Sequence, residues 1–225
     1  MGLLDDLRRK AEQLEAHRTA QARSFGESVL QVDDAMHHTF LYLNDLVKQL
    51  NVLNLPSPRT FDLEPGVRFE GLRLTDFFID FRKKMVLERE RYNFINLSFQ
   101  QTSTETISVR KELQPNITRF EDNLRRAGAT FEMNEIRNVR HMVTHADFNI
   151  RCMLRASIRV SAEHDSCNLR FTIRNVERLG GFDLVFPAED INDPMLEDCA
   201  RYIMGESNQF RSTGRYFALS PGAGS

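Results

Sequence analysis

The chain has 225 residues, of which 41% are hydrophobic and 28% are charged, and its formal net charge is −2. This size and composition predict one globular core, alone or with an extension, and the balanced charge excludes a global attraction to nucleic acid or anionic membranes. No apolar run reaches the ~18 residues that span a bilayer, and the first residues lack the order of a secretory signal. We therefore expect a cytoplasmic protein without membrane insertion.

Residues 1–55 predict a helical arm. Apolar side chains recur at steps of three and four residues, which is the spacing of one helix face. The stripe weakens around Gly26, and helix-capping patterns begin at Ser24 and Ser28. The arm is therefore either one long coiled-coil-like helix or a helical hairpin, and the sequence leaves both alternatives open.

The stripe must be covered, either by the core of the same chain or by another copy of the chain. We predict the second alternative, with a homo-oligomer that forms through residues 3–54. The side chains expected at this interface are Val32, Met36, Leu43, Val47 and Leu50.

Residues 66–207 predict an antiparallel β-rich domain, so the fold class is α+β. Prolines at 56, 58 and 65 mark a linker before it. The domain reads as a β-meander or barrel-like sheet, with short helices near residues 116–127 and 194–207. Residues 130–146 fit either a helix or a bulged strand, of which we favour the strand. The small and polar residues 208–225 predict a flexible tail.

The clearest strands, within residues 150–178, predict a hairpin with an arginine-rich face. A tight turn at His164 and Asp165 makes one face apolar and brings arginines opposite one another on the other face. The predicted pairs are Arg151 with Arg178, Arg155 with Arg174, and Arg159 with Arg170, and Ser157 and Thr172 lie between them. Directly opposed like charges destabilise an antiparallel pair.

Six positive charges on this face need counter-charge, and Asp183 supplies only one negative charge. Solvent, the acidic ends of the chain or a bound anion supplies the rest. Residues 65–187 hold 20 basic and 16 acidic side chains, whereas residues 1–64 hold 7 and 10 and residues 188–225 hold 3 and 6. The predicted face offers no aromatic side chain on which a nucleobase would stack.

Two short motifs on the hairpin resemble the paired motif of PilZ domains, which bind cyclic dinucleotides on a β-barrel. The motifs are Arg151-x-x-x-Arg155 and Asn175-x-Glu177-x-x-Gly180. The family pattern has Ser or Ala where Glu177 stands, and little strand sequence follows residue 187 to close such a barrel. The resemblance implies a cyclic dinucleotide as one form of the anion hypothesis.

Other residues give weak signals of chemistry. His141 and His145 would share a helix face and suit a metal pair, but a strand would separate them by ~13 Å. The three cysteines are far apart and form no C-x-x-C pair, so neither a disulfide framework nor a zinc ribbon is predicted. We predict no catalytic residue, metal or cofactor.

These observations favour a non-enzymatic interaction or scaffold protein that self-associates through its arm. The alternative is a regulatory module that binds an anion or a nucleotide, including a cyclic dinucleotide, on the arginine-rich hairpin. Two kinds of partner are left open, a protein and a phosphate-containing ligand. An enzyme is the third alternative for the function.

Overall fold

A computed structural model describes residues 3–218, with the side chains described from residue 13 to residue 217. The helices are α1 (Leu3–Leu53), α2 (Gln114–Ala127), α3 (Asp193–Met204) and α4 (Phe210–Thr213), and short 3-10 turns lie at His164–Ser166 and Ala188–Asp190. The strands are β1 (Phe61–Glu64), β2 (Val67–Phe69), β3 (Arg73–Val86), β4 (Arg89–Glu112), β5 (Phe131–Arg137), β6 (Val143–Glu163), β7 (Asn168–Arg174), β8 (Gly181–Pro187) and β9 (Arg215–Ala218).

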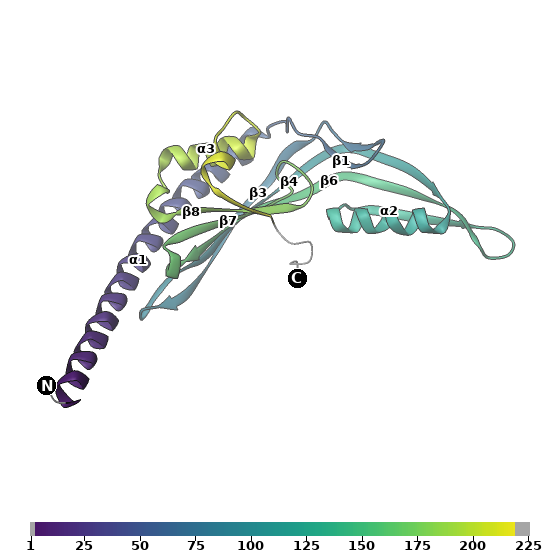
Figure 1. Ribbon diagram of the computed structural model, residues 1–225. Helices are drawn as coiled ribbons and strands as arrows, with labels where there is room; N and C mark the ends of the chain where they lie inside the picture. Colours follow the sequence, from purple (N-terminus) through teal and green to yellow (C-terminus); the bar gives the residue numbers. More distant parts are fainter. Residues whose placement is uncertain (1–2, 219–225) are drawn as a thin grey trace.

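Seven of these strands form one antiparallel sheet in the order β3-β4-β6-β7-β8-β9, and β5 also pairs with β6. β1 and β2 form a separate two-stranded sheet. The α+β class predicted from the sequence is confirmed. The large sheet is open rather than closed into a barrel (Figure 1).

The arm is one continuous helix, so the hairpin alternative does not form. Gly26 lies inside α1, where a side chain would meet open space. From Val29 onward one side of α1 packs on the sheet, whereas residues 13–24 are exposed and project past it (Figure 1). Among residues 3–218, no helix combines the length and the apolar character that crossing a bilayer requires.

The five side chains predicted at an assembly interface lie in the core of their own chain. Val32, Met36, Leu43, Val47 and Leu50 are each at most 7% exposed. They pack with apolar side chains of β3, β4, β6, β7, β8 and α3. The sheet of the same chain therefore covers the stripe, and no second copy is needed to keep it from water.

A second core lies at the other end of the sheet, where β4 and β6 extend past the arm. The β1–β2 hairpin and α2 pack there on Phe148 and neighbouring side chains of β6. Within α2, Phe120 meets Phe148 edge to face with ring centroids 4.9 Å apart. The helix ends at Gly128, whose φ of 70° allows the left-handed cap that returns the chain to β5.

The linker after α1 is anchored by buried polar side chains. The amide of Gln101, which is fully buried, accepts a hydrogen bond from Ser57 and donates to the carbonyl of Asn175. The guanidinium of Arg59 donates to the carbonyls of Val176 and Tyr202. Because this guanidinium leaves water, burial lowers the pKa of Arg59.

Part of the segment predicted as a flexible tail is ordered, which corrects that prediction. Phe210 is fully buried against the rings of Phe171 and Phe186, and β9 pairs with β8. The apolar ring of Phe210 supplies the burial that fixes this segment. Residues 219–225 lie outside the described part of the chain.

Candidate functional site

The hairpin between β6 and β7 has a wider turn than the sequence predicts. A turn of 3-10 helix at His164–Ser166 is followed by Cys167 with a φ of 54°. The pairing consequently shifts by two residues, and Ser157, Arg159 and Ser161 lie opposite Arg174, Thr172 and Arg170. The predicted pairing of Arg159 with Arg170 is therefore wrong.

The other two arginine pairs are also wrong. Arg174, the predicted partner of Arg155, ends β7 opposite Ser157, and the carbonyl of Arg155 accepts a hydrogen bond from the amide of Asn175. Arg151 lies farther along β6, opposite Thr106 of β4. Arg178 lies in the turn after β7 and donates to the hydroxyl of Tyr216. The shift by an even number of residues leaves the two faces of the hairpin as predicted.

We name the face that lies opposite the α1-covered core the outer face. One row across it reads, from β3 to β9, Asp80, Asn96, Arg159, Thr172, Asp183 and Phe217. The next row reads Arg82, Phe94, Ser161, Arg170, Val185 and Arg215. A third row holds Phe78, Ser98, Ser157, Arg174 and Gly181.

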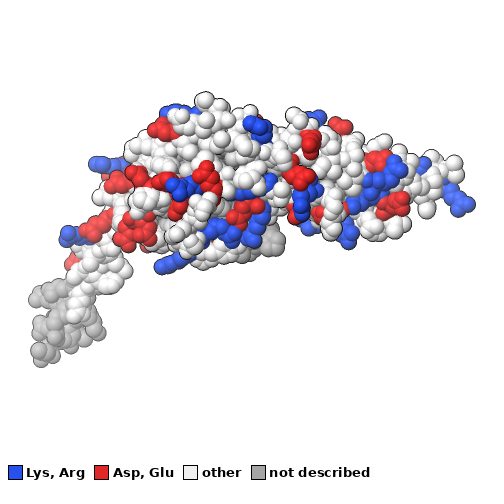
Figure 2. Space-filling model, turned by 90° about the horizontal axis from the view of Figure 1, so that it is seen from above, with Lys and Arg blue, Asp and Glu red and all other residues white. Residues whose placement is uncertain are grey.

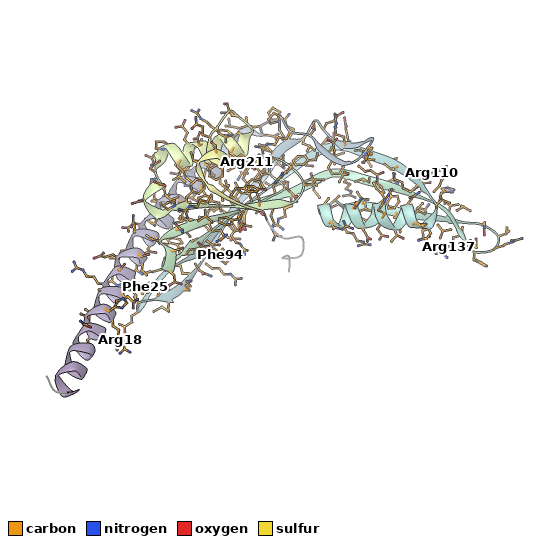
Figure 3. The ribbon with its side chains drawn as sticks, in the orientation of Figure 1. Arg18, Phe25, Phe94, Arg110, Arg137 and Arg211 are labelled. Carbon is orange, nitrogen blue, oxygen red and sulfur yellow. The ribbon has the colours of Figure 1, made fainter. Side chains whose placement is uncertain are left out.

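The hairpin itself carries no aromatic side chain on this face, but the strands beside it add three phenylalanines to the outer face. Phe78 is 59% exposed and Phe217 is 48% exposed. Phe94 is half-buried beneath the guanidinium carbon of Arg159, which lies 4.3 Å from the ring centroid. Figure 3 places Phe94 on the part of the sheet beside α1, far from Arg110 and Arg137 at the other end.

Arg170 on the outer face pairs with two carboxylates. Arg170 lies 2.5 Å from Glu163 and 3.1 Å from Asp183. Burial opposes its charge, yet the hydrogen bonds to both carboxylates raise the pKa of Arg170. Asp183 is 7% exposed, so its carboxylate is largely shielded from solvent.

Three outer-face arginines have no ion-pair partner in the described part of the chain. Among residues 13–217, no carboxylate forms an ion pair with Arg82, Arg155 or Arg159, and all three side chains are exposed. Arg155 and Arg159 are four residues apart on β6, which corresponds to about 13 Å along a strand. The hydroxyls of Ser157 and Thr172 are near them on the same face.

Among residues 13–217, the acidic side chains of α1 and α3 form no ion pair with the arginines of this face. α1 and α3 pack on the opposite face of the sheet, and Figure 2 shows acidic side chains gathered at that end of the molecule, as seen from above. Their carboxylates have partners there: Asp33 pairs with Arg91 at 2.7 Å, and Glu197 pairs with Arg201 at 2.6 Å. Counter-charge for Arg155 and Arg159 is left to solvent, to an external anion and to the nearby carboxylates of Asp76 and Asp80, which form no ion pair with them.

A hollow of about 430 Å³ adjoins the arginines. Its walls come from β3, β4, β6 and the turn after α2, and its lining includes Phe78, Gln100, Thr130 and Arg155. One carboxylate, that of Asp76, also lines it. The volume is in the range of about 300–1,000 Å³ that is typical of small-molecule sites.

The histidines and cysteines form no comparable site. His141 lies in the turn before β6 with a φ of 58°, and His145 lies on β6. Residues 130–146 are extended rather than helical, but a turn divides them between β5 and β6 where one bulged strand was predicted. Within residues 13–217, no three His, Cys, Asp or Glu side chains gather in a metal-binding arrangement. Cys152 and Cys199 are buried, and burial raises the pKa of the Cys199 thiol to about 12.

Comparison of this chain with known protein families, with curated proteins and with solved structures found no match. The resemblance of the hairpin motifs to PilZ domains gains no support from these comparisons. In the structure, the Asn175 side chain accepts a hydrogen bond from the backbone of Gly180 and thereby closes the turn after β7.

Proposed function

We propose that this protein is a binding protein that holds a phosphate-bearing ligand on the outer face of its sheet. The observation that carries the proposal is that Arg155 and Arg159 are both exposed on the same face of β6, without a carboxylate partner among the described residues. Guanidinium groups donate paired hydrogen bonds that match the geometry of phosphate oxygens. Ser157 lies between the two arginines and adds a hydroxyl donor.

Local charges support the same proposal. The outer face also carries Arg82 and Arg174, whereas the charge of Asp183 is already engaged by Arg170. Like charges on neighbouring strands repel one another, and a bound polyanion would relieve that repulsion. Exposed arginines arranged along a sheet also raise the rate at which an anionic ligand reaches it.

Inorganic polyphosphate is a suitable probe because it carries phosphate without a base or sugar. We expect binding whose affinity falls as salt rises, because phosphate contacts release counterions. Arg155→Ala with Arg159→Ala should weaken binding about tenfold or more and reduce the slope of log affinity against log salt by about 2.

The matched control replaces Arg119 and Arg140, which are exposed at the other end of the molecule. This double variant has the same net charge but keeps the outer face intact. An equal loss of affinity in both double variants would show that binding depends only on net charge, and would refute a site at Arg155 and Arg159. Absence of binding at low salt would refute the proposal.

Self-association through the arm is a second candidate function, consistent with a scaffold role. Residues 13–24 of α1 are exposed on all sides, and Leu14 is 54% exposed. Helical residues exposed on all sides gain nothing from the tertiary packing that supplies most helical stability in proteins. A second copy of the chain packed on this projecting part would stabilise it. Light scattering on the purified protein tests this candidate, and a monomer at tens of micromolar would refute it.

A further inference from the structure

We infer that the phosphate-bearing ligand is single-stranded nucleic acid, whose bases stack on phenylalanines of the outer face while its phosphates contact the arginines. This inference rests on the proposed function and adds the class of ligand. It accounts for a feature that phosphate binding alone leaves unexplained, namely aromatic rings exposed among the arginines.

Two phenylalanine rings of the outer face are exposed. Phe78 and Phe217 leave about half of their surface in water on a sheet whose other face has a well-packed core. Single apolar side chains are common on protein surfaces, but these two lie on the same face as Arg155 and Arg159. A nucleobase stacked on each ring would remove that apolar surface from water.

The guanidinium of Arg159 lies over the ring of Phe94, with its central carbon 4.3 Å from the ring centroid. The ring holds the guanidinium on the sheet by a cation–π contact. Bases stack on guanidinium planes as well as on aromatic rings in complexes with single strands. Arg159 can therefore present a flat cation to a base while its neighbour Arg155 contacts a phosphate.

The exposed rings lie at opposite edges of the sheet. β3, which carries Phe78, and β9, which carries Phe217, are the two edge strands of the order β3-β4-β6-β7-β8-β9. Five strand spacings separate them by about 24 Å, and the arginines of β6 and β7 lie between them. Rings at both edges with cations between them suit a flexible chain of several nucleotides rather than one mononucleotide.

The form of the face argues against a duplex. A duplex keeps its bases stacked inside, and proteins read it with a helix or ribbon that enters a groove. The outer face is a sheet surface whose rings contact only bases that are unstacked and turned outward. The hollow beside Arg155, at about 430 Å³, offers space for one such base next to Phe78.

The inference is tested by fluorescence anisotropy with three probes: a labelled single-stranded 12-nucleotide RNA or DNA, the duplex of the same sequence, and inorganic polyphosphate. We expect the single strand to bind at least tenfold tighter than the duplex. Phe78→Ala and Phe217→Ala should each weaken single-strand binding about tenfold, because one stacking partner is lost. Polyphosphate affinity should stay unchanged in both variants.

The matched control is Tyr216→Ala. Tyr216 is the neighbour of Phe217 on β9, is 45% exposed and points to the opposite face of the sheet. We expect it to leave single-strand affinity unchanged. Asp80→Asn gives a change in the other direction, because removing a carboxylate from the row of Arg159 should strengthen binding of the single strand about twofold or more.

The outcomes separate the inference from the proposed function. If polyphosphate binds but the phenylalanine variants retain single-strand affinity, or the duplex binds as tightly, the inference is refuted and phosphate binding stands. If neither polyphosphate nor the oligonucleotide binds, both fail. Tighter binding of poly-glutamate than of the oligonucleotide would assign the face to an acidic protein partner instead. Thermal melts verify folding, and Phe78 on β3 keeps the test valid if Phe217→Ala loosens β9.

Discussion

Replacing Leu43 by alanine tests how the arm is held. Leu43 is 1% exposed in the core between α1 and the sheet, and the substitution removes three carbon atoms from it. At about 0.8 kcal/mol for each buried methylene, the lost transfer free energy is about 2.4 kcal/mol, and the remaining cavity adds to it. We expect the free energy of unfolding to fall by about 3–4 kcal/mol. For a chain of this size the melting temperature should fall by about 10 °C.

Urea unfolding followed by circular dichroism measures the change, and light scattering on the same samples measures mass. Leu14→Ala is the matched control, because the same atoms are removed from a side chain that is 54% exposed. We expect it to alter stability by less than about 0.5 kcal/mol. If Leu43→Ala leaves stability unchanged but dissociates an oligomer, the stripe packs on a second copy and the reasoning fails.

Further substitutions test particular contacts. Asp33→Ala leaves the buried guanidinium of Arg91 without its carboxylate at 2.7 Å, so urea unfolding should show a loss of about 3 kcal/mol, whereas Asp45→Ala, which breaks an exposed pair with Lys48, should cost little. Gly205→Ala should lower the melting temperature, because φ is +79° and the added carbon would lie 2.5 Å from Pro58, whereas Gly26→Ala should stabilise α1 by up to about 1 kcal/mol. Burial and the nearby Lys84 lower the pKa of His164, so its contribution to stability is complete above about pH 6.5 and is lost as the pH falls toward the folded-state pKa. His164→Gln should flatten this part of the stability profile between pH 7 and 5, and a wild-type protein that gains stability there relative to the variant would contradict the assignment.

The two faces of the β6–β7 hairpin were predictable from the sequence, but the pairing was not. Side chains of a strand alternate between faces, so Arg155, Arg159 and Arg174 were placed correctly on one side. The pairing depends on the turn, and Cys167 adopts a left-handed conformation that its residue type does not favour. The turn lengthened by these residues places Arg159, Arg170 and Arg174 opposite hydroxyl side chains instead of other arginines.

The aromatic part of the candidate site could not be found within the hairpin. Phe78, Phe94 and Phe217 come from β3, β4 and β9, and their positions beside the arginines depend on the register of long-range strand pairs. The pairing of β3 with β4 also shifts between Thr75 and Phe78, so alternation alone misplaces the face of Phe78. Pattern analysis of one strand at a time cannot supply this information.

The sequence also did not determine which part of the protein covers the apolar face of the arm. The spacing from Val32 to Leu50 predicts an apolar helix face, and burial confirms that this face is covered. The same spacing suits a partner helix and a sheet equally well, because both bury apolar side chains. Only the fold of the rest of the chain shows that β3, β4 and β6 fill this role.

The central claim is that the outer face holds a phosphate-bearing ligand, and a nuclear magnetic resonance map of the site tests it most directly. Backbone amide shifts of the isotope-labelled protein are recorded while inorganic polyphosphate is added at low salt. We predict that the largest changes in amide chemical shift occur around Ser157, Arg159 and Thr172. Shifts confined to residues 138–142 or to α2 would contradict it, and so would a spectrum that does not change.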